Sequence, residues 1–163
     1  YNLSYWSSWS NGFNIWKSEF DKIDKNLKLN KLFPHTSLFL TQHQAKLFCI
    51  NDNLLFDVQR IPKRGGHNKF EAFTIEYPSL LDECCKKGHI STKCKKHILF
   101  GIMVQFLPSL LFNKYIIRIE TFDDTGFRDN LKKYYPSYAY WLVLISVLGV
   151  PFRLFCRKLK NKR

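Results

Sequence analysis

The sequence predicts an α+β fold: an N-terminal amphipathic helix and a small antiparallel sheet domain, followed by one C-terminal transmembrane helix. Three observations predict it: aromatic residues with helical spacing near the N-terminus, short alternating apolar runs in the middle, and an uncharged stretch from Tyr134 to Phe152. The expected organisation is an amphipathic aromatic helix over 1–30, a β-rich domain over 31–133, a transmembrane helix over 134–156 and a basic tail over 157–163.

The N-terminal helix is predicted from apolar residues that recur at alternating spacings of three and four. They are Trp6, Trp9, Phe13, Trp16, Phe20, Ile23 and Leu27. This spacing places them on one face of a helix. The face has three interpretations: it packs on the sheet of its own domain, lies at a membrane surface, or binds a partner helix. Under the last interpretation, the partner-binding residues are Trp6, Trp9, Phe13 and Trp16.

Strands are predicted where short apolar runs alternate with polar residues. The expected strands are 45–50, 54–58, 70–77, 97–107 and 115–122. In the fourth run Ile98, Phe100 and Ile102 would point to one side of a sheet. A second membrane span through 98–113 is the alternative for this run, although the stretch is short and contains Pro108.

The C-terminal span has flanks typical of a membrane helix. As a helix, Tyr134–Phe152 is about 28 Å long, close to the ~30 Å hydrocarbon thickness of a bilayer. Tyrosines and Trp141 gather at its start, and six basic residues follow Phe152. These flanks predict an organelle membrane, of the endoplasmic reticulum or the mitochondrial inner membrane, with residues 1–133 on the non-cytosolic side. A buried core helix is the alternative.

Cysteine usage suggests two disulfides. Cys49, Cys84, Cys85 and Cys94 precede the span, and Cys156 lies beyond it. A bond between the adjacent Cys84 and Cys85 is sterically poor, so the expected pairing joins one of them to Cys94 and the other to Cys49. Reduced structural thiols are the alternative.

The same region contains an imperfect zinc pattern. Cys84, His89, Cys94 and His97 supply two thiols and two imidazoles within a short segment. The spacing lacks the first ligand of a zinc knuckle, so no metal site is predicted unless the compartment is reducing.

Basic residues outnumber acidic ones by 26 to 13, which gives a formal charge of +13 at pH 7. Two basic segments contain Lys63 and Arg64, and Lys95 and Lys96. Their cations are expected to contact phosphate, either of lipid headgroups or of an RNA backbone. A solvated loop is the alternative for each segment.

No constellation in the sequence predicts catalysis, and no cofactor is expected. The carboxylate pairs are adjacent in sequence, and the histidines are scattered without a nucleophile partner. The sequence therefore favours a non-catalytic, single-pass accessory or assembly subunit whose partners are the bilayer and other subunits of a membrane complex. A basic organellar RNA-binding protein, such as a ribosomal subunit, and a membrane enzyme acting on lipids are the alternatives.

Overall fold

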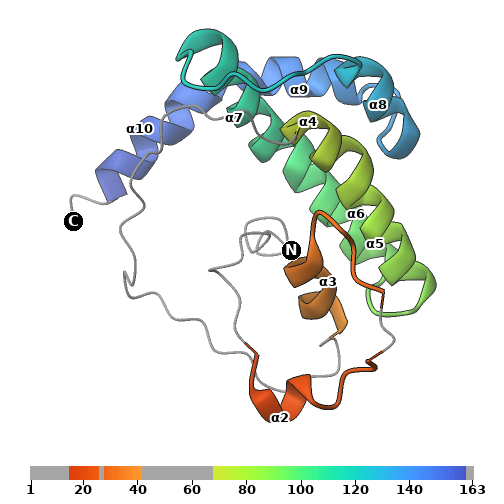
Figure 1. The fold of residues 1–163 in the computed structure, drawn as a ribbon. Helices are drawn as coiled ribbons and strands as arrows, with labels where there is room; N and C mark the ends of the chain where they lie inside the picture. The colour runs from red at the N-terminus through yellow and green to blue at the C-terminus, as the bar shows by residue number, and fades with distance from the viewer. Residues whose placement is uncertain (1–14, 26–27, 42–67, 161–163) are drawn as a thin grey trace.

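The computed structural model describes residues 15–25, 28–41 and 68–160. Over these ranges the chain is helical and contains no strand. The predicted α+β class with its small antiparallel sheet is therefore wrong, and the described part of the protein has an all-helical fold (Figure 1).

Two long helices form an antiparallel hairpin at the centre of the described fold (Figure 1). The first comprises α4 (Lys69–Glu71), η2 (Ala72–Glu76) and α5 (Tyr77–Lys86). The second comprises α6 (Thr92–Gly101), η3 (Ile102–Phe106), α7 (Leu107–Leu111) and η4 (Phe112–Ile116). The η segments are wider turns with π-helical hydrogen bonds, so each long helix runs without a break.

Side-chain caps begin both helices of the hairpin. The Asn68 side chain accepts from the amide of Glu71 at 3.0 Å, and the Ser91 hydroxyl accepts from the amide of Cys94 at 3.1 Å. Each bond satisfies an amide that has no carbonyl partner in the first turn of a helix. Gly88, at φ +74°, lets the chain turn back between them.

Prolines explain the position of two wide turns. Pro78 and Pro108 lie directly after the first residue that follows η2 and η3. Proline lacks an amide hydrogen, and its ring collides with the carbonyl four residues earlier in a regular α-helix. The wide turn makes room for the ring and lets the helix continue through the proline.

The segments predicted as strands 70–77 and 97–107 lie inside these two helices. In the first, Phe70, Phe73, Thr74 and Tyr77 are buried, at the spacing of one helix face. The predicted strand 115–122 begins in the last turn of η4 and continues as irregular chain without strand structure. The predicted strands 45–50 and 54–58 lie outside the described residues.

Three further helices cover the far end of the hairpin. They are α8 (Phe127–Tyr134), α9 (Ala139–Leu148) and α10 (Val150–Lys160), and α9 crosses η3 and α7 (Figure 1). The irregular segment between η4 and α8 is tied back by ion pairs of Lys69 with Glu120, at 3.1 Å, and of Lys114 with Asp124. These pairs fix where α8 begins.

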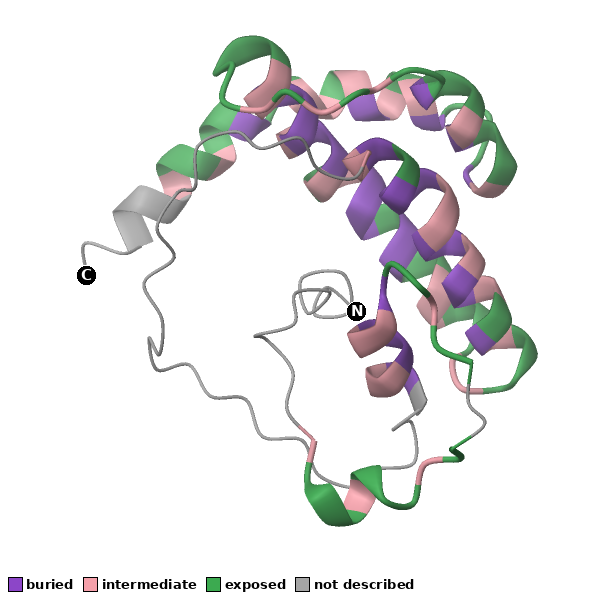
Figure 2. Cartoon of the chain, viewed as in Figure 1, coloured by how far each residue is buried: buried purple, intermediate pink, exposed green. Residues whose placement is uncertain are grey.

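The N-terminal part of the described chain contains α2 (Lys17–Phe20) and α3 (Pro34–Thr41). Phe33, just before α3, packs edge-on against the rings of Phe73 and Tyr77, with centroids 5.4 and 5.0 Å apart. The predicted long helix over 1–30 is not present in its described part, where the only helix is the short α2. Buried residues concentrate along the hairpin, whereas much of α10 is exposed (Figure 2).

One continuous helix of the described chain is long and apolar enough to cross a membrane: Thr92–Ile116, of which 56% of the most apolar window is buried within the protein. It contains 98–113, so the predicted strand there is a helix, and the alternative of a second membrane span for this segment stays a prediction. The predicted transmembrane helix 134–156 corresponds to the end of α8, a short connection, α9 and the first part of α10. α9 and α10 are long and apolar enough only as a pair, and they meet at an angle of 48°.

Candidate functional site

One face of α9, continued on α10 as far as Phe155, is apolar and exposed. Its large side chains, with exposed fractions between 58% and 81%, are Tyr138, Trp141, Ile145, Leu148, Phe152 and Phe155. Their spacing alternates between three and four residues, which keeps them on one side of consecutive helical turns. We call this set the apolar stripe.

The opposite face of α9 is in the core. Ala139 and Val143 have no exposed surface and pack against the hairpin. α9 contains no charged residue, so both of its faces are apolar, yet the described residues cover only one of them. A helix that is apolar on all sides normally lies in a protein core or in a membrane. The part of the stripe on α9 is therefore the uncovered half of an apolar helix, of the kind that contacts lipid or another protein.

Arg153 is the only charged residue between Tyr134 and Cys156, and its charge is turned inward. Its Nη1 donates to the carbonyl of Val104, and its Nη2 lies 3.4 Å from the carbonyl of Ser146. In a regular helix the Val104 carbonyl would accept from residue 108, which is a proline without an amide hydrogen. Arg153 therefore ties α10 to a carbonyl of η3 one turn before Pro108, and the stripe carries no charge.

The bend between α9 and α10 has an identifiable cause. Pro151 cannot donate to the Val147 carbonyl, and Gly149 between the helices bonds the Ser146 carbonyl at 3.2 Å in a tighter turn. The stripe follows the bend, because Leu148 precedes it and Phe152 follows it. Aromatic residues lie at its start, and basic residues follow it in the sequence.

The predicted partner-binding face is described at one residue. Trp6, Trp9 and Phe13 lie outside the described residues. Trp16, directly before α2, is 81% exposed and makes no side-chain capping bond, and Phe20 at the end of the same helix is 51% exposed. The described part of this aromatic face is thus not used in the core.

The structure has Cys84, Cys85 and Cys94 as free thiols, and Cys49 lies outside the described residues. No disulfide joins the three described cysteines of the predicted pairing to one another. Cys85 instead places its Sγ 3.6 Å from the Thr92 hydroxyl across the turn of the hairpin. Burial raises the pKa of Cys84 to about 11, so its thiol is neutral and weakly nucleophilic at neutral pH.

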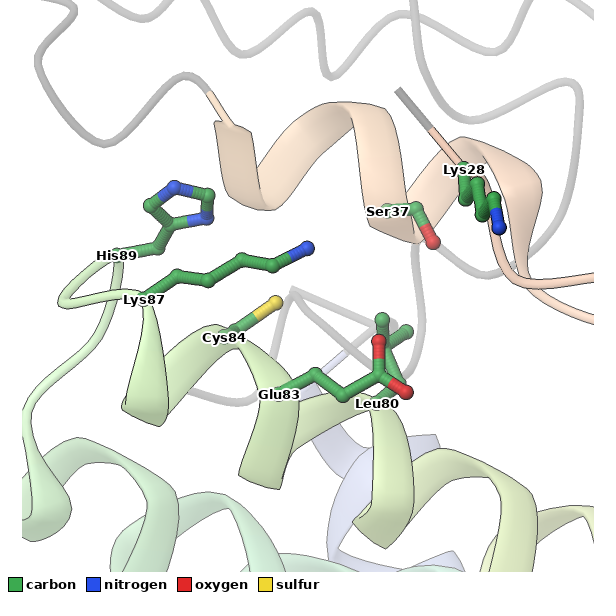
Figure 3. Close-up of a pocket in the computed structure, with 7 residues that line it drawn as sticks. All are labelled: Lys28, Ser37, Leu80, Glu83, Cys84, Lys87 and His89. Carbon is green, nitrogen blue, oxygen red and sulfur yellow. The ribbon is translucent and has the colours of Figure 1, made fainter. Parts of the chain in front are cut away.

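The zinc pattern is not assembled in the structure. No three His, Cys, Asp or Glu side chains among the described residues lie close enough together to hold a metal ion, so Cys84, His89, Cys94 and His97 form no ligand set there. Cys84 and His89 line a recess of about 20 Å³ between α3 and α5 (Figure 3). The complete lining is Lys28, Ser37, Leu80, Glu83, Cys84, Lys87 and His89. This volume holds about one water molecule.

The structure describes two of the four predicted phosphate-contacting residues, and it places them in different environments. Lys63 and Arg64 lie outside the described residues. Lys95 forms an ion pair with Asp82 at 2.6 Å, which occupies its charge within the hairpin. Lys96 is exposed on α6.

The residues of the apolar stripe are not among the predicted site residues, although their spacing is visible in the sequence. The period of three and four from Tyr138 to Phe155 is readable without a structure, but it was hidden inside a longer uncharged run. The inward role of Arg153 depends on Val104, far away in sequence, and had no local signal.

No protein-family model matches the chain, and no curated protein or solved structure shows significant similarity to it.

Proposed function

We propose that the protein is a non-catalytic accessory subunit held at an organelle membrane by the apolar stripe, whose occupant is the acyl region of the lipid bilayer. The observation that carries this proposal is the uncovered apolar half of α9 and its continuation on α10.

The energetic argument rests on exposed apolar surface. Burying one large apolar side chain contributes about 1.5–3 kcal/mol, so a row of six exposed ones is unfavourable in water. Contiguous patches of this kind mark protein or membrane contacts rather than ordinary surface. Acyl chains cover such a patch without a matching protein shape.

Charge and aromatic placement favour lipid over a partner helix. Tyr138 and Trp141 at the start of the stripe suit the headgroup depth, where amphipathic rings are enriched. The residues that follow the stripe in the sequence, from Arg157 onward, are basic and suit anionic headgroups. The charge of Arg153 is directed away from the stripe, as a lipid-facing surface requires.

The helix pair suits the membrane better than Thr92–Ile116 does. More than half of the apolar window of Thr92–Ile116 is covered by the protein itself, and its first turns carry several lysines. The apolar parts of α9 and α10, Ala139–Leu148 and Val150–Cys156, are about 15 and 10 Å long, so together they approach the ~30 Å hydrocarbon core, and either one alone covers half of it or less.

The accessory role is supported by a second exposed apolar element, at Trp16 and Phe20 of α2. Aromatic side chains of this size dominate the energy of protein interfaces. We assign this element to a neighbouring subunit.

The first experiment changes the stripe in the full chain. Ile145→Arg with Leu148→Arg places two charges in the stripe at residues that are 64% and 81% exposed. Each arginine near the bilayer centre costs about 2.5–3.5 kcal/mol on insertion scales. We expect the wild type to stay in the membrane pellet after carbonate extraction and the variant to move to the supernatant. Because both residues are exposed, thermal unfolding in detergent should change little.

The matched control introduces the same two charges at Leu29 and Leu32, which are 38% and 37% exposed and lie before α3. It should remain in the pellet. Retention of the stripe variant contradicts the lipid contact. The same membranes, extracted with a mild detergent, should yield a native particle well above 19.5 kDa, and a monomer would contradict the accessory role.

A further inference from the structure

The first turns of α6 present a face that the apolar stripe does not explain. Lys93, Lys96, His97 and Phe100 lie at the spacing of one helix face and are all exposed, Phe100 by 54%. We call these four residues the tip face, because they run along α6 from the turn of the hairpin (Figure 1).

The charge of the tip face is not neutralised by the described residues. Lys93 and Lys96 form no ion pair within the described chain, unlike Lys95, which is paired with Asp82. Lys86 and Lys87, at the other side of the turn, are exposed as well, against one exposed carboxylate, Glu83, at the end of α5. The turn of the hairpin is thus a concentrated positive surface.

Stability does not account for these side chains. Lysines in the first turns of α6 oppose the positive end of the helix dipole, which costs about 0.3–1 kcal/mol for each badly placed charge. Phe100 exposes its ring while its neighbours Ile98 and Leu99 are buried. Cations and an aromatic ring on one exposed face are typical of surfaces that bind single-stranded nucleic acid, by phosphate contacts and base stacking.

We propose that the tip face binds single-stranded nucleic acid, with Lys93 and Lys96 contacting phosphates and Phe100 stacking on a base. The binding is sequence-tolerant, because lysines read phosphate and every base has a face on which to stack. This activity is independent of the membrane attachment, and together the two would hold a nucleic acid near a membrane.

The position of the tip face argues against headgroups of the bilayer that covers the stripe. α9 packs on η3 as well as on α7, and from Lys96 to Ile102, where η3 begins, the helix rises about 9 Å. α9 itself, with the width of a whole helix, lies between η3 and the stripe. The screening length at physiological salt is about 8 Å. Figure 1 shows the turn of the hairpin and the α9–α10 pair at opposite ends of the described fold.

An acidic protein partner is also disfavoured. Protein interfaces rely on a buried apolar centre, usually with several anchors. From residue 69 to 99 the chain exposes no large apolar side chain, so Phe100 stands alone among the lysines. One ring among cations is enough for stacking and too little for a protein interface.

The test is fluorescence anisotropy of a labelled single-stranded RNA of mixed sequence, titrated with the full chain in detergent over a range of salt. We expect Lys93→Gln with Lys96→Gln to make the slope of log K against log salt shallower by about 1.4, because each lost phosphate contact removes about 0.7 for a single strand. Phe100→Leu keeps an apolar side chain but loses stacking, and should weaken binding at least about fivefold.

The matched control is Lys31→Gln with Lys133→Gln, which removes two exposed lysines that form no ion pair within the described residues and should leave the slope unchanged. Circular dichroism checks that every variant is folded. If both double variants lower the slope equally, the binding depends only on the net charge of the protein, and the assignment to the tip face is overturned. Unchanged binding by Phe100→Leu, equal affinity for polyglutamate, or a loss seen only with anionic vesicles would each overturn it as well.

Discussion

A buried carbonyl shows how single residues join the C-terminal helices to the hairpin. In η2 the Tyr77 amide bonds the carbonyl of Ala72, and Pro78 has no amide hydrogen, so the Phe73 carbonyl has no donor within its helix. The Tyr135 hydroxyl donates to it at 2.8 Å, and both groups are buried. One phenol therefore compensates for the wide turn that the proline requires.

Tyr135→Phe tests this contact. The variant keeps the ring but leaves the Phe73 carbonyl buried without a donor, which costs about 1–3 kcal/mol. For a chain of this size we expect the melting temperature to fall by roughly 2–4 °C for each kcal/mol lost, measured by circular dichroism. Tyr138→Phe, at an exposed tyrosine, is the control and should change stability by less than about 0.5 kcal/mol. Equal melting temperatures for the two variants would show that the hydroxyl contributes nothing.

At the scale of elements, one arginine holds α10 against the hairpin. Arg153 bonds the Val104 carbonyl in η3 across the bend at Gly149 and Pro151. The exposed residues of α10 add little packing, since Phe152 and Phe155 point away from the core. The angle of the helix pair therefore depends on few contacts.

Arg153→Gln should loosen α10 without unfolding the hairpin. Glutamine is shorter and neutral, so the Val104 carbonyl loses a charge-assisted bond, typically stronger than a neutral one. We expect amides of α10 to exchange hydrogen at least about tenfold faster in mass spectrometry, with α6 unchanged. Lys133→Gln is the control for charge. If α10 exchanges at the wild-type rate, packing alone holds the helix.

The two prolonged helices show why short apolar runs were mistaken for strands. Between Ile98 and Phe106 the residues satisfy a period of two, but nearly all are apolar, so a helical period fits as well. Burial of both Ile98 and Leu99, and of both Ile102 and Met103, is the helical solution. In 70–77 the buried residues Phe70, Phe73 and Tyr77 are three and four positions apart, which is a helical spacing. The alternation of Thr74 and Glu76 with apolar residues also fits a strand, so the sequence alone does not distinguish the two.

For the whole molecule, the hairpin separates two surfaces of different chemistry. The apolar stripe lies on the helices that cover one end, and the tip face lies at the turn at the other end (Figure 1). Substitutions at distant sites without shared contacts are additive within about 0.3–0.5 kcal/mol. The two proposed contacts should therefore vary independently.

This independence is directly measurable. The Lys93→Gln and Lys96→Gln pair should float with neutral liposomes as the wild type does, whereas the Ile145→Arg and Leu148→Arg pair should bind single-stranded RNA with an affinity within about twofold of the wild type. A variant with all four substitutions should lose membrane binding in liposome flotation as the arginine pair does. In anisotropy it should lose RNA binding as the glutamine pair does. If the variant with four substitutions loses more of either binding activity than the corresponding pair does, the two surfaces are coupled.

The sequence by itself determined what is local in this protein: its excess of positive charge, the apolar run near the C-terminus with aromatic residues before it and basic residues after it, and the absence of a recognisable catalytic motif. These depend on residue type and spacing alone. Over the described residues, the tertiary structure decided which apolar runs are helices, which half of α9 remains uncovered, and which lysines form no ion pair. Those outcomes depend on contacts such as Arg153 with Val104 and Tyr135 with Phe73, which join residues about 50 to 60 positions apart. No local pattern encodes them, because nothing close to Phe73 or Val104 in the sequence specifies which distant side chain will bond its carbonyl.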